Sequence, residues 1–170
     1  MQYLSYMPGK RWEISLFESV IWQARDSSYK RGVELSYLNP VIFFRPLEFN
    51  LGSFDNDLMG INLRFTAFKG IILYGQFLID DMRIKDFLAG NGEYRDKYGL
   101  QAGVRTYDIF GIKNLFLQTE YNTIRPYTYS HRSPVQNYSN AREPLAHPAG
   151  ANTKEAVLIA NYNFKRLYLN

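Results

Sequence analysis

The chain has 170 residues, of which 46% are hydrophobic and 16% aromatic, and it carries a formal net charge of +4 and no cysteine. This length suffices for one domain with a substantial core, and a chain without cysteine has no disulfides or thiol chemistry. The basic residues are spread along the chain, so no nucleic-acid partner is predicted. No apolar run reaches the roughly 18 residues of a membrane-spanning helix.

The sequence is a succession of short segments in which apolar and polar residues alternate. Such alternation is typical of β-strands, and a helical period is hard to find. We therefore predict one all-β, antiparallel domain over residues 1–170, with roughly eight strands. The predicted strands are 11–24, 33–38, 41–50, 58–68, 71–80, 98–108, 114–123 and 155–165, with another opening near Tyr168.

The hairpin 58–80 shows the alternation most clearly, because Leu63 and Phe65 flank Arg64 and the apolar series resumes after a tight turn. Successive side chains of a strand point to opposite faces, so the hairpin has one apolar and one polar face. In the first predicted strand Glu18 interrupts the apolar series. The sequence therefore leaves open which face of that strand is the apolar one.

Alternation fits two architectures. In a soluble sandwich the apolar face is the core, whereas in an outer-membrane barrel it meets lipid and the polar face lines the lumen. Abundant tyrosine, segments close to the roughly 10 residues that cross a bilayer at a tilt, and alternating connection lengths favour the barrel. Connections at 68–70 and 110–114 are short, whereas those at about 81–97 and 124–154 are long and polar. We predict an antiparallel transmembrane outer-membrane β-barrel with long extracellular loops.

The polar phase of the later strands holds large charged and amide side chains. A wet or plugged lumen tolerates such side chains, whereas a dry core requires partners for them. On a sandwich they would instead face bulk water. The predicted lumen-lining residues are Arg64, Gln76, Gln101, Arg105, Gln118, Glu120 and Asn122.

The segment 124–154 is rich in tyrosine and arginine and holds both histidines. Sugars need flat aromatic faces for their C–H surface and planar donors and acceptors for their hydroxyls, and this segment supplies both. The alternative is a structural loop that folds over the barrel mouth and is packed by its tyrosines. The predicted glycan-binding residues are Arg125, Tyr127, Tyr129, His131, Arg132, Gln136, Tyr138, His147 and Asn152.

The sequence predicts no catalytic residue, metal site or cofactor. Two widely separated histidines without cysteine are a weak metal signal, and no G-x-S-x-G nucleophile elbow is present. A non-enzymatic protein is the expectation.

Two segments, 39–65 and 129–155, resemble the Wzi-type family of capsule-assembly outer-membrane proteins, in particular its Bacteroidetes members of the RemB gliding-motility type. The Pro-Leu-x-His-Pro-x-Gly-x-Asn run at 144–152 is the most specific part. The resemblance implies a large outer-membrane barrel of which this chain matches the C-terminal portion. The positions that carry over are His131, Gln136, Tyr138, Pro144, His147, Gly150, Asn152 and Glu155.

Taken with the resemblance, these features predict a barrel in the bacterial outer membrane, at the cell surface, that binds or organises capsular polysaccharide. Its expected partners are outer-membrane lipid, surface polysaccharide and proteins of the gliding or secretion machinery. The alternatives are a structural subunit of a gliding or type IX secretion complex and a porin-like channel. The N-terminus lacks the pattern of a signal peptide, so we expect a mature or partial piece of the exported protein.

Overall fold

The computed structural model describes residues 1–24, 30, 32, 55–80, 97–141, 143–165 and 167–169. The predicted strands 33–38 and 41–50 and residues 81–96 of the first predicted long loop lie outside the described residues. Residue 97, which was assigned to that loop, belongs instead to a strand.

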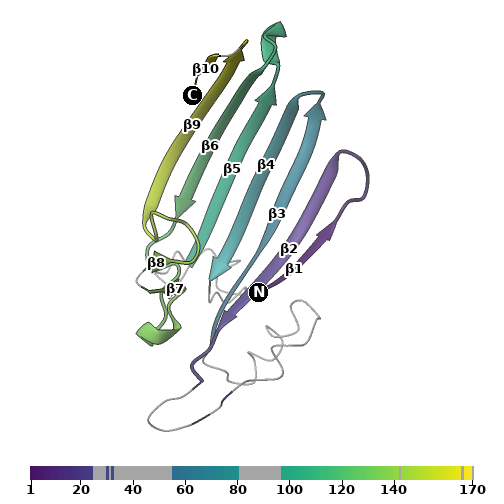
Figure 1. The fold of residues 1–170 in the computed structure, drawn as a ribbon. Coiled ribbons are helices and arrows are strands. Elements are labelled where there is room, and N and C mark those ends of the chain that lie inside the picture. The colour runs from purple at the N-terminus through teal and green to yellow at the C-terminus, as the bar shows by residue number, and fades with distance from the viewer. Residues whose placement is uncertain are drawn as a thin grey trace.

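The described residues form one eight-stranded antiparallel sheet whose strands follow chain order, with β1 and β10 at its edges (Figure 1). The helices in this part of the chain are short 3-10 turns at Ile109–Gly111 and Pro134–Gln136. None is long and apolar enough to cross a membrane. The prediction of an all-β, antiparallel fold is confirmed. The strands of this sheet are β1 (Gln2–Tyr6), β2 (Trp12–Ile21), β3 (Asn56–Phe68), β4 (Ile71–Asp80), β5 (Lys97–Tyr107), β6 (Leu115–Ile124), β9 (Thr153–Phe164) and β10 (Leu167–Leu169).

β1 is the one strand of the sheet that the sequence reasoning missed entirely. It is short, and it forms a hairpin with β2 in which Leu4 lies opposite Leu16 and Ser5 opposite Ser15. Most of its side chains are exposed, since β2 is the only described strand beside it. Its conformation therefore depends on the pairing with β2 more than on a pattern of its own.

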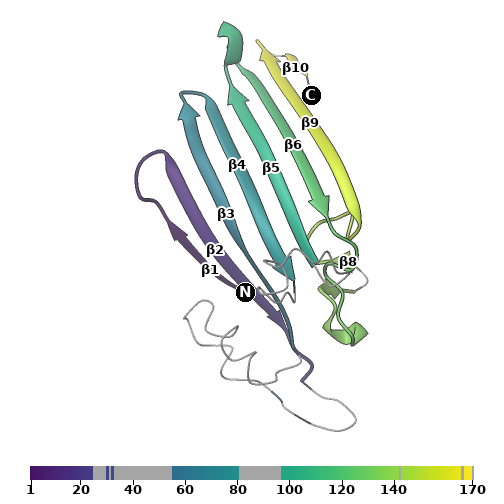
Figure 2. The same cartoon turned by 180° about the vertical axis from the view of Figure 1, so that it is seen from behind.

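Tight connections lie at one end of the sheet and long ones at the other, as Figures 1 and 2 show. The turn after β3 depends on Gly70, whose φ is +82° and whose carbonyl accepts a hydrogen bond from the Tyr107 amide. The loop 125–152 belongs to the opposite end and carries a small hairpin, β7 (Ser139–Asn140) with β8 (Glu143–Pro144). The predicted long loop at 124–154 is thus present, with slightly narrower limits.

The strand registers separate a polar face from an apolar face. Along the polar face, directly opposed cross-strand partners form a line across the sheet, which we call the polar row. Its members, from β1 to β9, are Ser5, Ser15, Asn62, Gln76, Gln101, Asn122 and Glu155.

The apolar face carries large side chains that remain exposed across the sheet. Leu73 is 41% exposed, Leu100 44% and Leu158 72%. The described strands pack extensively only with their neighbours in the sheet, so no described strand covers these side chains. The buried core lies on the polar face instead, where Phe17, Leu58 and Leu78 form a cluster.

The sheet is open within the described residues, where β1 pairs only with β2 and β10 only with β9. Among the described residues, each of these two strands therefore has a strand neighbour on one side only. Such edges are closed in a barrel and pair with further strands in a larger sheet.

Candidate ligand-binding site

The loop 125–152 folds back onto the polar face at the end of the sheet with the long connections. Tyr129 and Tyr138 pack against the cluster of Phe17, Leu58 and Leu78. The two tyrosine rings lie 6.3 Å apart between centroids. Aromatic side chains of the loop and aliphatic side chains of the strands thus form one small core.

Hydrogen bonds fix the loop to the strands that it covers. The Tyr138 hydroxyl donates to Ser19 Oγ at 3.0 Å, and Asn56 Nδ2 donates to the Gln136 carbonyl at 2.8 Å. The backbone amide of Tyr129 donates to the carboxylate of Asp80, which is fully buried. These contacts join the loop to three different strands, so the loop is an integral part of the fold.

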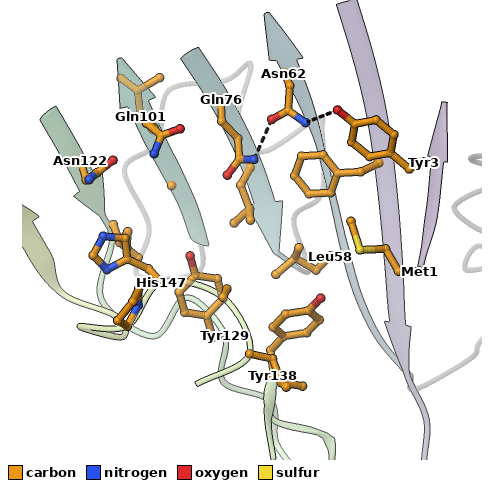
Figure 3. A pocket seen from close by; sticks show the side chains of 18 residues that line it. Met1, Tyr3, Leu58, Asn62, Gln76, Gln101, Asn122, Tyr129, Tyr138 and His147 are labelled. Atoms are coloured by element: carbon orange, nitrogen blue, oxygen red, sulfur yellow. Dashed lines mark hydrogen bonds between the residues drawn. The ribbon is translucent and has the colours of Figure 1, made fainter. Parts of the chain in front are cut away.

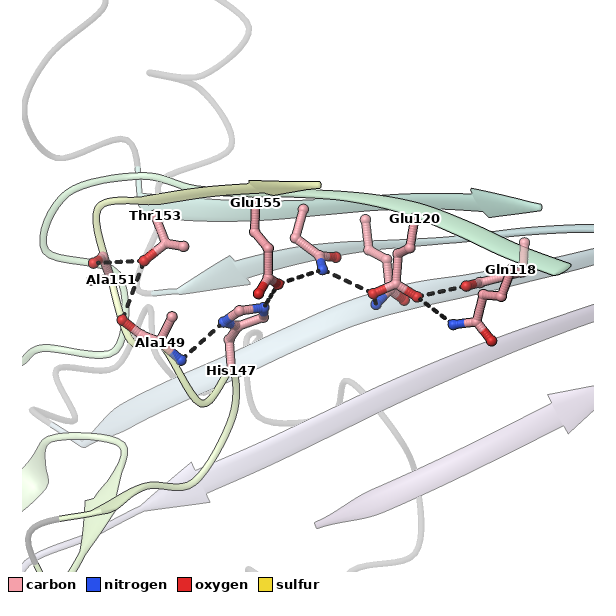
Figure 4. A network of polar contacts seen from close by, with 10 residues as sticks. Gln118, Glu120, His147, Ala149, Ala151, Thr153 and Glu155 are labelled. Atoms are coloured by element: carbon pink, nitrogen blue, oxygen red, sulfur yellow. Dashed lines mark hydrogen bonds and ion pairs between the residues drawn. The ribbon is translucent and has the colours of Figure 1, made fainter. Parts of the chain in front are cut away.

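His147 holds the last part of the loop against β9 (Figure 4). Its Nδ1 accepts a hydrogen bond from the Ala149 amide at 3.2 Å, so the proton of the neutral ring resides on Nε2. Nε2 lies 3.1 Å from Glu155 Oε2, and Asn122 Nδ2 donates to the same oxygen at 3.2 Å. Glu155, the last member of the polar row, therefore connects the loop to the sheet.

A cavity of about 430 Å³ lies between the polar row and the loop (Figure 3). The polar row supplies one wall and the loop the facing wall, with the core cluster between them. Its lining includes Asn62, Gln76, Gln101 and Asn122 from the row, Tyr129, Tyr138, Leu145, Ala146, His147 and Pro148 from the loop, and Phe17, Leu58 and Leu78 from the cluster.

The amide side chains of this wall donate to other protein groups but retain acceptors. Gln76 Nε2 donates to Asn62 Oδ1 at 2.6 Å, Gln101 Nε2 to Glu120 at 3.1 Å, and Asn122 Nδ2 to Glu120 at 2.8 Å. Within the described part of the chain, no side chain or backbone group donates to the side-chain oxygens Gln76 Oε1, Gln101 Oε1 or Asn122 Oδ1. The wall therefore offers a ligand three hydrogen-bond acceptors.

A second polar network lies beside the cavity, toward the end with the tight turns. Glu120 accepts hydrogen bonds from Tyr74, Gln101, Gln118 and Asn122, and Gly103 lies between Tyr74 and Glu120 in the ladder. A Cβ atom at Gly103 would lie 2.3 Å from Tyr74 Cζ. The absence of a side chain there lets the Tyr74 ring reach across the strand to Glu120.

Tyr129 is a neutral side chain of the cavity. Burial raises the pKa of Tyr129 to about 12; the charge of Asp80 adds to the rise, and a hydrogen bond from the His147 backbone opposes it. Among the described residues, no Lys, Arg, Asp or Glu lines the cavity. This part of the chain can therefore bind uncharged polar groups there, and it supplies no Lys or Arg for a carboxylate or phosphate ligand.

The structure divides the predicted glycan-binding residues into two groups. Tyr129, Tyr138 and His147 line the cavity. Among the others, Gln136 is only 4% exposed and its Nε2 donates to Asp55 at 3.4 Å, whereas Tyr127 is 63% exposed. The residues of the predicted set that do not line the cavity are Arg125, Tyr127, His131, Arg132, Gln136 and Asn152.

The predicted lumen-lining residues all lie on the polar face, but only some of them meet the loop. Gln76, Gln101 and Asn122 line the cavity, and Glu120 supports it through its contacts with Gln101 and Asn122. The others lie nearer the tight turns, where Arg64 contacts Glu13 at 3.4 Å. Arg105 donates to Gln118 at 3.1 Å there.

The apolar lining of the cavity was missed by the sequence reasoning, although a signal for it exists. Leu58 and Leu78 occupy the polar phase of their strands, as the registers with Asp80 and Gly99 place them on the face of the polar row. An apolar residue in a polar phase indicates that something covers the face at that point. Here the cover is the loop 125–152.

Comparisons with protein-family models, with curated proteins and with solved structures found no match for this chain. The described residues also contain no group of three or more His, Cys, Asp or Glu side chains that could hold a metal ion. The functional argument therefore rests on the geometry of the sheet and the cavity.

Proposed function

We propose that the chain forms part of the wall of a bacterial outer-membrane β-barrel, with its apolar face toward lipid and its polar face toward the interior. The supporting observation is the inverted arrangement of the two faces. In a sandwich the apolar face is covered and the polar face meets water. Here the described loop covers the polar face, and exposed leucines remain on the apolar face.

We further propose that this barrel is non-enzymatic and binds or organises surface polysaccharide. The cavity combines neutral aromatic rings with a wall of amide acceptors, and these are the groups that recognise hydroxyl-rich rings. The exposed Tyr127 and Arg132 at the outer side of the loop offer additional contacts to a longer chain.

A second candidate is a structural subunit of a gliding or type IX secretion complex. The exposed apolar face supports it, because contiguous apolar surface also marks protein interfaces. An open porin-like channel is less well supported, since the loop 125–152 occupies part of the polar face.

Purification of the full-length protein from the membranes of the cells that produce it, in mild detergent, tests these proposals. Mass spectrometry and sugar analysis would identify what co-purifies. Polysaccharide without stoichiometric protein supports the polysaccharide-binding barrel. Stoichiometric motility or secretion proteins support the complex subunit, and recovery in the soluble fraction contradicts the barrel.

A further inference from the structure

We propose that the cavity between the polar row and the loop 125–152 binds a single uncharged sugar unit of a surface polysaccharide. This inference rests on the proposed function and deepens it, because it names the site and the class of sugar. It places recognition beneath the loop, on the polar face of β3 to β6, and not at the exposed tip of the loop.

The first argument is the unbalanced hydrogen bonding of the wall. The side-chain oxygens of Gln76, Gln101 and Asn122 accept no hydrogen bond from any described group, while their side-chain nitrogens are engaged. Asn122 is only 4% exposed, so its acceptor has little access to bulk water. Neighbouring strands lie about 4.8 Å apart, so the row presents acceptors at intervals comparable to the width of a sugar ring. Sugar hydroxyls are donors that satisfy such acceptors.

The second argument is the facing apolar surface. Tyr129 and Tyr138 lie side by side at the cavity in Figure 3, and the Tyr138 hydroxyl is engaged by Ser19. Phe17, Leu58 and Leu78 support the tyrosine rings from the strands. A pyranose ring has an apolar C–H surface that packs on aromatic rings while its hydroxyls reach the polar wall.

The third argument is charge. Two carboxylates lie directly behind the lining, since Glu120 and Glu155 both accept hydrogen bonds from Asn122. No Lys or Arg of the described residues lines the cavity, and His147 is engaged by Glu155. A uronic acid would meet like charge without a compensating cation, so the site selects neutral sugars over acidic ones.

The fourth argument is size. At about 430 Å³, the cavity lies in the lower part of the range of roughly 300–1,000 Å³ seen for small-molecule sites. This space suits one sugar unit, such as a chain end or a side branch, better than several consecutive units of a polymer.

The test measures binding of free sugars to the purified full-length protein in detergent by saturation-transfer NMR. The probes are glucose, galactose and mannose, with glucuronate, galacturonate and mannuronate as their respective acidic counterparts. We expect at least one neutral sugar to bind and its acidic counterpart to bind at least tenfold more weakly. Equal or tighter binding of the acids overturns the assignment of sugar class.

Two matched variants locate the site. Gln76→Leu removes an acceptor that lines the cavity, and we expect about tenfold weaker binding, the effect of one lost hydrogen bond. Asn161→Leu removes a similar amide from the same face outside the cavity, and we expect no change. Equal effects of the two substitutions overturn the location of the site.

A filling variant gives an independent check. Gly99 lines the cavity, and a Cβ atom there would meet only ordinary contacts, the nearest being Ile124 and Leu78 side-chain atoms at 3.7 Å. Gly99→Val should abolish sugar binding while the protein remains folded by circular dichroism. If no neutral sugar binds although purified capsular polysaccharide still does, the cavity assignment fails and the proposed function stands. If neither binds, both fail.

Discussion

At the scale of single residues, small side chains decide which polar contacts form. Gly103 leaves room for the Tyr74 ring to cross the strand, so that the Tyr74 hydroxyl donates to Glu120. The guanidinium carbon of Arg105 lies 4.5 Å from the centroid of the same ring. Glu120 in turn orients Gln101 and Asn122, which line the cavity. One glycine therefore influences the wall of a site that it does not line.

Gly103→Ala should lower the free energy of unfolding by about 1–3 kcal/mol, because the new methyl group displaces Tyr74 from Glu120. Gly99→Ala is the matched control, since its Cβ would approach no atom closer than 3.7 Å. Urea unfolding followed by tryptophan fluorescence measures both. A loss for Gly99→Ala as large as that for Gly103→Ala would contradict the role of the Tyr74 ring.

Tyr129 and Tyr127 form a second matched pair, because both have positive φ and only one is packed. Tyr129→Ala removes a ring from the core cluster and should cost about 3 kcal/mol. Tyr127→Ala should change stability by less than about 0.5 kcal/mol, since that side chain is 63% exposed. Thermal unfolding monitored by circular dichroism compares them, and similar losses would show that the packing of Tyr129 is unimportant.

At the scale of elements, the alternation of the sequence predicted most strands of the sheet. It did not predict which strand residues the loop 125–152 covers. The period of two is local, and β2, β3, β4, β5, β6 and β9 correspond to predicted strands. β1 escaped prediction because its conformation depends on pairing with β2. The phase of β2, which Glu18 obscured, is settled by the registers, which place Leu16 opposite Ile61 on the apolar face.

The turn between β3 and β4 offers a test at this scale. Gly70→Ala should destabilise the hairpin by about 1 kcal/mol or more, the typical cost of a strained backbone conformation. The φ of Gly70 is +82°, and the new Cβ would lie 2.5 Å from the Tyr107 carbonyl oxygen. Gly111→Ala shares the positive φ but would meet nothing within 4 Å. Hydrogen exchange of the β4 amides reports the opening of the hairpin. Equal exchange in the two variants would exclude the contact with Tyr107 as the cause.

At the scale of the whole molecule, the exposed apolar face distinguishes a membrane wall from a water-facing sheet. Leu63→Arg places a charge in the middle of that face, because Leu63 lies halfway along β3 and opposite Gly75 of β4. In a bilayer this should cost about 2–4 kcal/mol of folding free energy, whereas an exposed leucine in water would tolerate the change within about 0.5 kcal/mol. Gln118→Arg on the polar face is the control.

The two variants are folded into lipid vesicles. The insertion of each variant is measured by how its electrophoretic mobility changes on heating. We expect the Leu63 variant to insert poorly and the Gln118 variant to insert like the parent chain. Equal insertion of both, or full solubility without lipid, would argue for a water-exposed sheet or for a face covered by protein.

The sequence by itself determined most strands of the sheet and, for most of them, the separation into two faces, because both depend on residues close together in the chain. Only the tertiary structure decided that Gln76, Gln101 and Asn122 lie in one row and that Tyr129, Tyr138 and His147 face them. Cross-strand register and the docking of the loop depend on contacts between distant residues. A pattern of local alternation contains no information about those contacts. The sequence therefore could not show that members of the predicted lumen-lining set and of the predicted glycan-binding set line the same cavity.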